Sequence, residues 1–169
     1  AINWLGPRQL TEQIRPKLAD GASVVTLASR AGAQWAEHLD VLRPCLPIRD
    51  IDGLRAQLLR TEMTEARAYE LSKELLIVWT MQESAFDQGI RFNTVSPSSV
   101  DTRLSPDFKA AFQGRATQNR SLVSRAATVA EVAAAVCFLA SREASWINGV
   151  DLKVDGGITA KRLLQELAL

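Results

Sequence analysis

Three short apolar runs, each preceded by a longer stretch with helical spacing, limit what this chain can fold into. The runs "SVVTLAS" at 23–29 and "IRFNTVSP" at 90–97 contain β-branched residues without a clean alternation of apolar and polar side chains. Such runs are typical of strands covered on both faces, as in a parallel sheet. A third run, "GVDLKVDGG" at 149–157, completes a helix–strand order that occurs three times. This order predicts an α/β fold with a parallel, doubly wound sheet.

The segments between these runs predict the helices. Apolar residues that recur every three to four positions indicate helices over roughly 3–18 and 64–87. The capping box "TVAE" at 128–131 predicts the start of another long helix. Shorter helices are expected near "LRAQLLRTEM" at 54–63 and "PDFKAAFQG" at 106–114.

Length and charge exclude several classes of protein. A chain of 169 residues fits a single domain, 1–169, with enough length to bury a core. The formal net charge of +1 gives no reason to expect nucleic acid or an anionic membrane surface as a partner. No apolar run approaches the ~18–20 residues needed to span a membrane.

The two cysteines and the single histidine form no recognisable site. Cys45 lies between two prolines and is expected in a loop, whereas Cys137, in "AAAVCFLA", is expected in the core. Their spacing matches no metal-ligand or redox motif. His38 has no histidine or cysteine nearby, so we expect no metal site. The lack of a disulfide framework favours a reducing compartment, the cytoplasm.

Chemistry is expected where the strands end, because ligands of doubly wound sheets bind at the carboxyl ends of the strands. Those ends are Ser29, the segment 96–102 and the segment 155–157. The Ser29 hydroxyl could hydrogen-bond a substrate oxygen. Pro97 and Thr102 could meet a flat amide ring with backbone and hydroxyl groups.

Tyr69, the only tyrosine, is followed four residues later by Lys73, so a helix places both side chains on one face. A tyrosine with an ordinary pKa near ~10 is a poor base at neutral pH. A nearby ammonium lowers that pKa, and the pair could then move a proton to or from an alcohol oxygen. The same spacing also occurs by chance on solvated helix faces, so the pair alone does not decide between the two interpretations.

Five segments together resemble the short-chain dehydrogenase/reductase family, in the order in which that family has them. They are "NWLGPRQLTEQIRPKL", "SVVTLASRAG", "YELSK", "IRFNTVSPSSVDT" and "INGVDLKVDGG", which run from Asn3 to Gly157. The resemblance implies a Rossmann-type sheet and an oxidoreductase that uses NAD or NADP to interconvert an alcohol and a carbonyl.

The resemblance also implies a role for each matching residue. Tyr69 would be the general acid/base, Lys73 would lower its pKa and bind the nicotinamide ribose, and Ser29 would hold the substrate oxygen. Asn3 would fix a water in the proton relay. The implied cofactor-binding positions are Tyr69, Lys73, Pro97, Ser98, Val100 (through its backbone) and Thr102.

Two departures from the family pattern concern the cofactor. The usual Pro-Gly pair is Pro97-Ser98 here, which makes this loop less tolerant of positive φ. The glycine-rich GxxxGxG turn and the residue that selects NAD or NADP are absent from the sequence. We therefore expect a carboxyl-terminal portion of a longer dehydrogenase, lacking the first nucleotide-binding half and exposing the sheet edge where that half would pair.

A third departure is the separation of Ser29 and Tyr69 by 40 residues, where the family commonly has about a dozen. The extra stretch, roughly 36–63, resembles an insertion in two subgroups. These are the bacterial 3α-hydroxysteroid dehydrogenase/carbonyl reductases and the coniferyl-alcohol dehydrogenases. The resemblance favours a coniferyl-type aromatic alcohol as substrate, with 3α-hydroxy or 3-keto steroids as the alternative.

Several substrate and partner assignments stay open. Trp35 is either an aromatic wall of the substrate site or part of the insertion core. Leu104 and Phe108 either belong to a substrate lid over 103–127 or pack a helix. The resemblance implies a homodimer or homotetramer. The rival function is a catalytically silent fragment or binding module, since the phosphate-binding loop is absent.

An interface between subunits is one interpretation of three large side chains on two long predicted helices. Trp4, Leu75 and Trp79 could belong to such an interface, because family members commonly pair through these helices. The insertion in the steroid-type relatives is expected to disturb that arrangement, so no particular interface is predicted.

Overall fold

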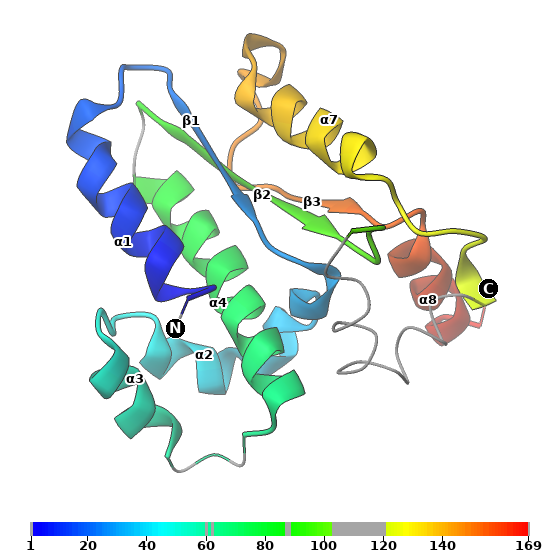
Figure 1. The fold of residues 1–169 in the computed structure, drawn as a ribbon, viewed down its shortest axis with the longest axis horizontal. Coiled ribbons are helices and arrows are strands. Elements are labelled where there is room, and N and C mark those ends of the chain that lie inside the picture. Colours follow the sequence, from blue (N-terminus) through cyan, green and yellow to red (C-terminus); the bar gives the residue numbers. More distant parts are fainter. Residues whose placement is uncertain (1, 60, 62, 87–88, 103–120, 169) are drawn as a thin grey trace.

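The computed structural model describes residues 2–59, 61, 63–86, 89–102 and 121–168, and Figure 1 shows how its elements are arranged. In chain order the helices and strands are α1 (Leu5–Ile14), β1 (Ser23–Leu27), α2 (Leu39–Cys45), α3 (Ile51–Leu58), α4 (Glu65–Phe86), β2 (Arg91–Pro97), α7 (Val129–Ala140), β3 (Asp151–Val154) and α8 (Ile158–Glu166). Short 3₁₀ turns lie between them: η1 (Arg15–Lys17), η2 (Arg30–Gly32), η3 (Trp35–His38) and η4 (Arg142–Ala144).

The three strands form one parallel sheet in the order β1-β2-β3, which confirms the predicted α/β class. Val25 is opposite Asn93, and Val95 is opposite Leu152. The central strand β2 is buried from its second residue onward, whereas β1 and β3 are only partly covered. Because the strands are parallel, all three carboxyl ends lie at one edge of the sheet.

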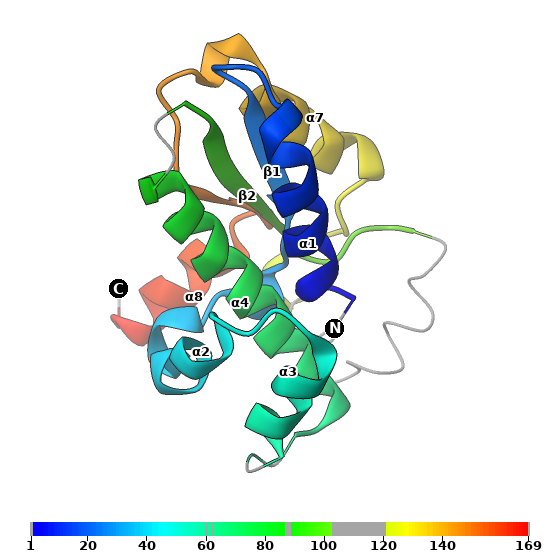
Figure 2. The ribbon, with the colours of Figure 1, turned by 90° about the vertical axis from the view of Figure 1, so that its left-hand side faces the viewer.

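Helices cover both faces of this sheet. Figures 1 and 2 show α1 and α4 on one face and α7 on the other. The capping box predicted for α7 is present: Thr128 Oγ1 accepts from the Glu131 amide at 3.3 Å, and Glu131 Oε2 accepts from the Thr128 amide at 2.8 Å. Val132 and Leu139 of α7 pack with Val95 of the sheet in the smaller of two apolar cores.

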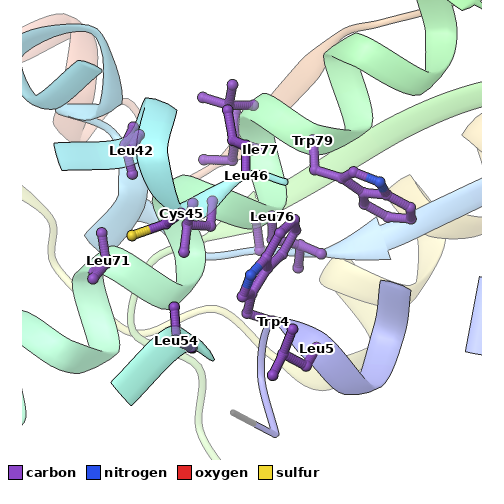
Figure 3. Packing of buried hydrophobic residues seen from close by; sticks show 13 residues of the cluster. Trp4, Leu5, Leu42, Cys45, Leu46, Leu54, Leu71, Leu76, Ile77 and Trp79 are labelled. Atoms are coloured by element: carbon purple, nitrogen blue, oxygen red, sulfur yellow. The ribbon is translucent and has the colours of Figure 1, made fainter. Parts of the chain in front are cut away.

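The larger core joins α1 and α4 to the segment 36–63, as Figure 3 shows. The Trp4 and Trp79 rings meet edge to face with centroids 6.0 Å apart. Trp4 and Leu75 are each 1% exposed, and Trp79 is 2% exposed. These three side chains, for which the sequence left a subunit interface open, are buried in the chain's own core, to which α2 and α3 contribute.

Two helices, α2 and α8, were not predicted from the sequence, and each cysteine lies in the environment expected of the other. Helix α2 was missed because Pro44 lies inside a short segment, where proline usually indicates a break. Cys45 on this helix is fully buried rather than in a loop, and Cys137 on α7 is exposed rather than in the core. Helix α8 was not predicted because it follows a glycine pair, and its N-cap residue, Gly157, has a left-handed φ of 85°.

Other predicted elements are confirmed or moved slightly. The helix predicted over 64–87 is α4, and the one predicted over 3–18 is the shorter α1 followed by η1. The helix expected over 54–63 begins earlier, as α3. The one expected over 106–114 lies outside the described residues.

One edge of β1 is open among the described strands. The Ala28 amide donates to the Val95 carbonyl at 2.9 Å, so Ala28 faces β2 and the backbone groups of Leu27 face the other way. The Leu27 side chain is 53% exposed. None of the described helices is long and apolar enough to cross a bilayer.

Candidate active site

The carboxyl end of β1 and the first half of α4 bring Ser29 and Tyr69 together. Ser29 follows the strand in an extended conformation and caps η2, with its Oγ accepting from the Ala31 amide at 3.2 Å. The Ser29 side chain also hydrogen-bonds the Tyr69 phenol. Either hydroxyl can donate in this hydrogen bond, and donation from Ser29 to the phenol oxygen is the direction that favours the phenolate and so lowers the Tyr69 pKa.

Gly32 sets the distance between the serine turn and α4. A Cβ at this position would lie 2.9 Å from the Lys73 carbonyl carbon and 3.0 Å from the Glu74 amide nitrogen. Both are backbone atoms, which cannot rotate away. The turn therefore contacts the α4 backbone beside Lys73, and this contact fixes where Ser29 can lie.

Gly32→Ala should destabilise the fold by about 1–3 kcal/mol, the usual cost of overpacking. The matched control is Gly6→Ala in α1, where no atom lies within 4 Å of the added Cβ. That control should keep or slightly raise the free energy of unfolding, since alanine favours a helix. Urea unfolding measures both variants. Equal stability of the two would contradict the close approach described for Gly32.

The structure corrects the expected pKa of Tyr69. Burial of the phenol raises its pKa above the ordinary value, and the hydrogen bond from Ser29 lowers it by less. From the sequence, the Lys73 ammonium was expected to lower the pKa of Tyr69. In the structure Lys73 Nζ lies 5.7 Å from the centroid of the Tyr69 ring, and burial dominates.

Lys73 extends from α4 to the open edge of the sheet. Its Nζ donates to the Leu27 carbonyl at 3.0 Å, a carbonyl that faces away from β2. Burial lowers the pKa of the Lys73 ammonium. The lysine and the tyrosine thus share one helix face, as predicted, and both reach the carboxyl end of β1.

The structure leaves the roles of Asn3 and Trp35 as predictions. Asn3 lies in the exposed turn before α1, which begins at Leu5. Trp35 in η3 is partly buried and packs against the larger apolar core. Its packing agrees with the insertion-core interpretation, and part of its ring stays accessible.

The loop after β2 carries the predicted cofactor positions. Pro97 is buried at the end of β2. Ser98 Oγ is buried without a hydrogen-bond partner among the described residues. Val100 forms an isolated parallel bridge with Ala127, and Thr102 is exposed.

A cavity of about 450 Å³ adjoins this loop at the ends of β2 and β3, and Ser98, Val154, Asp155 and Lys161 contribute to its lining. Leu104, Phe108 and most of the predicted lid lie outside the described residues.

A buried charged cluster on α4 was not recognised in the sequence. Glu74, next to Lys73, is 1% exposed and accepts from Arg67 Nη1 at 2.9 Å and Nη2 at 2.8 Å. His38 Nδ1 lies 2.8 Å from the same carboxylate. The seven-residue spacing of Arg67 and Glu74 could have suggested a pair on one helix face, but nothing in the sequence marks that face as buried.

The Asp155 carboxylate, at the carboxyl end of β3, is a second charged group that was not predicted from the sequence. The Asp155 carboxylate accepts from the amides of Gly157 at 2.9 Å and Thr159 at 2.8 Å, which caps α8. Burial raises the pKa of Asp155, but these hydrogen bonds and the charge of Arg30 together bring it below the ordinary value. Arg30 follows Ser29 directly, so its charge links the serine turn to the end of β3.

Comparison with known proteins supports the family suggested by the motifs. A family model described as "Enoyl-(Acyl carrier protein) reductase" matches residues 58–159. The chain is 30% identical over 163 residues to a coniferyl-alcohol dehydrogenase from Pseudomonas sp. (strain HR199 / DSM 7063), across 94% of this chain and 64% of that protein. It is 28% identical over 171 residues to a 3-alpha-hydroxysteroid dehydrogenase/carbonyl reductase from Comamonas testosteroni, across 95% of this chain and 65% of that protein.

The solved structures include one match of similar extent. The 3-alpha-hydroxysteroid dehydrogenase from Pseudomonas sp. B-0831, solved with NADH, superposes with a TM-score of 0.80 at 27% identity. The match covers 95% of this chain and 65% of that one. The chain thus spans just under two thirds of the length of each of these relatives.

The family model covers more than half of the chain and includes Tyr69, Lys73 and two of the three carboxyl-edge segments, 96–102 and 155–157, but not the serine turn. The relatives extend the match over nearly the whole chain. With the parallel sheet and the contact between Ser29 and Tyr69, these matches lead to one conclusion: the chain belongs to the short-chain dehydrogenase/reductase family.

Proposed function

We propose that this chain provides the catalytic part of an NAD(P)-dependent oxidoreductase that interconverts an alcohol and a carbonyl. The observation that carries the proposal is the hydrogen bond between Ser29 and the Tyr69 phenol at the carboxyl end of β1, with Lys73 one helical turn away. This edge of the sheet is where ligands of doubly wound folds bind. A phenol that is half-buried there has both the position and the chemistry to exchange a proton with a substrate oxygen.

In the proposed mechanism, Ser29 holds the substrate oxygen beside the Tyr69 phenol. Tyr69 donates its proton to the oxygen when a carbonyl is reduced and takes the proton back when an alcohol is oxidised. Lys73 keeps a positive charge near the phenol, which favours the phenolate that oxidation requires. A bound nicotinamide would supply or accept the hydride.

The residues after β2 fit the nicotinamide end of NAD or NADP. The buried Ser98 hydroxyl has no hydrogen-bond partner among the described residues and therefore has a free donor for a polar ligand group. Pro97, Val100 and Thr102 would complete the contacts with the carboxamide, and Lys73 would bind the ribose. The glycine-rich turn that would hold the phosphates is absent from the sequence, and no phosphate contact is assigned to the described residues.

A coniferyl-type aromatic alcohol is the proposed substrate. The identity to a coniferyl-alcohol dehydrogenase over 94% of the chain supports it, and the accessible part of Trp35 offers an aromatic surface near the serine turn. The second candidate is a 3α-hydroxy or 3-keto steroid, favoured by the structural match with a TM-score of 0.80. We further propose a cytoplasmic homodimer or homotetramer, with Leu104 and Phe108 as contributors to the substrate site.

The proposal is tested by nucleotide titration and by turnover, both measured on a protein that joins this chain to a glycine-rich phosphate-binding half. Binding of NADH, followed by its fluorescence, and alcohol-dependent reduction of NAD or NADP should both be detected, with coniferyl alcohol turned over faster than a 3α-hydroxysteroid. A reversed preference would favour the steroid assignment. Absence of both binding and turnover would contradict the enzyme proposal and favour the rival, a catalytically silent binding module.

The pH dependence of the two directions should differ in sign. Burial raises the pKa of Tyr69, so the phenol is protonated at neutral pH. Alcohol oxidation needs the phenolate, and its kcat/KM should rise about tenfold per pH unit below the Tyr69 pKa. Carbonyl reduction needs the protonated phenol and should stay level, falling only above that pKa. An oxidation rate that falls with rising pH would show that Tyr69 is not the base.

A further inference from the structure

The chain that follows Ser29 contacts helix α4 at three points. Ser29 hydrogen-bonds the Tyr69 phenol. Gly32, three residues later, lies against the α4 backbone at Lys73 and Glu74. His38, at the end of η3, approaches the Glu74 carboxylate with its Nδ1 2.8 Å from Oε1. The segment from Ser29 to His38 therefore wraps part of the way around the helix that carries the proposed catalytic pair.

The last of these contacts is part of a closed cluster of charged groups. Arg67 binds both carboxylate oxygens of Glu74 at 2.9 and 2.8 Å and reaches Glu70 at 3.5 Å. Since a carboxylate only accepts, His38 Nδ1 must carry the proton that it shares with Glu74. Glu74 is 1% exposed, and the His38 side chain is 33% exposed. The Glu74 carboxylate is therefore the buried centre of the cluster, and His38 is a partly accessible member of it.

This cluster does not face the proposed reaction. At about 100° per residue, Arg67 and Glu74 lie within about 20° of each other around α4. Tyr69 lies about 160° from Arg67 on the same helix. The cluster can influence the tyrosine only through the helix backbone or through the segment that leads back to Ser29.

We propose that His38, Glu74 and Arg67 form a positioning cluster that holds the Ser29 hydroxyl against the Tyr69 phenol from the far side of α4. The proposal extends the proposed function, because it gives the cluster a role in placing two of its residues. Arg67 fixes the direction of the Glu74 carboxylate, Glu74 fixes His38, and the short segment back through Gly32 transmits that position to Ser29. None of the three touches the reacting atoms.

Tyr69 can report on its own hydrogen bond, because it is the only tyrosine in the chain. Fluorotyrosine incorporated into the whole chain gives a single fluorine resonance, and the change of that resonance with pH yields the phenol pKa. The measurement needs neither substrate nor turnover. Ser29→Ala removes a hydrogen bond that favours the phenolate and should raise the measured pKa.

If the cluster positions Ser29, His38→Ala should raise the phenol pKa by at least half of the shift seen in Ser29→Ala. His38→Gln, which can still donate to Glu74, should return the pKa toward the wild-type value. The double variant Ser29→Ala/His38→Ala should match Ser29→Ala alone, because the position of an absent hydroxyl no longer matters.

The matched control breaks another ion pair on the same helix. Glu83, near the end of α4, pairs with Arg15, and Glu83→Gln should leave the phenol pKa unchanged. If His38→Ala lowers the free energy of unfolding but keeps the wild-type phenol pKa, the cluster only holds the fold and the proposal is overturned. Should His38→Ala fail to fold, Glu74→Gln, which keeps the side-chain size, gives the same comparison.

The outcome also separates this proposal from the proposed function. A protein that shows the expected pKa shifts but no turnover with any alcohol upholds the positioning cluster and contradicts the enzyme assignment. A protein that turns over alcohols but shows no shift of the phenol pKa in His38→Ala upholds the enzyme assignment and contradicts the positioning cluster.

Discussion

Tyr69→Phe is expected to lower kcat for alcohol oxidation by about 10²–10⁴-fold, the usual contribution of a general acid/base. Phenylalanine keeps the ring and its packing on α4 but removes the only atom that can exchange a proton with the substrate oxygen. The hydrogen bond to Ser29 is also lost, which should cost stability by about 1 kcal/mol. The loss of rate should therefore far exceed the loss of stability.

The control for this variant removes a hydroxyl from the same helix away from the site. Ser84 Oγ donates to the Met81 carbonyl at 2.7 Å, and Ser84 lies roughly 22 Å along α4 from Tyr69. Ser84→Ala should retain wild-type kcat. Turnover is measured from the absorbance of the reduced nicotinamide, and circular dichroism checks the fold. Near wild-type turnover in Tyr69→Phe would remove Tyr69 from the mechanism.

Arg67→Ala should lower the free energy of unfolding by about 3–5 kcal/mol, because it leaves a buried carboxylate without its bidentate partner. Glu74 is 1% exposed, so its carboxylate has little access to solvent while the helix stays packed. The hydrogen bonds to Glu74 raise the pKa of Arg67, as expected when the charged form is held in place. The unfolding free energy is measured by urea titration of the wild-type and variant chains.

The Arg125–Glu131 pair provides a control of the same geometry at the surface. Arg125 also binds both carboxylate oxygens, at 2.8 and 2.6 Å, but its side chain is 64% exposed. Arg125→Ala should change stability little, because exposed ion pairs are screened by solvent. The double variant Arg67→Met/Glu74→Leu should be more stable than Arg67→Ala alone, since it leaves no buried charge. If Arg67→Ala and Arg125→Ala lose the same stability, burial is not what gives the Arg67 pair its strength.

The segment 36–63 has two structural effects that bear on function. Its helices α2 and α3 complete the core over α1 and α4, as Figure 3 shows. Its beginning carries His38 to the Glu74 carboxylate. Arg8, 5% exposed, fixes the segment further by donating to the carbonyls of Leu46 at 2.5 Å and Ile48 at 3.2 Å. The segment 36–63 is therefore part of the packing around helix α4.

The sequence by itself determined the elements whose signals are local. Non-alternating runs predicted the three parallel strands, although only β2 is buried along its length. The capping box predicted the start of α7, and the i,i+4 spacing placed Tyr69 and Lys73 on one helix face. These features depend on a few neighbouring residues, so they can be recognised without the fold. The order of motifs along the chain was enough to suggest the family.

Only the tertiary structure decided which residues far apart in sequence come together. Glu74 became the buried centre of a cluster because His38, 36 residues earlier, folds onto its face of α4. The pKa of Tyr69 is raised rather than lowered because burial depends on everything packed around the ring, not on Lys73 alone. For the same reason, Cys45 is buried and Cys137 is exposed, the opposite of what their neighbours in the sequence predicted. Burial is a property of the assembled fold, and a residue's neighbours in the chain do not fix it.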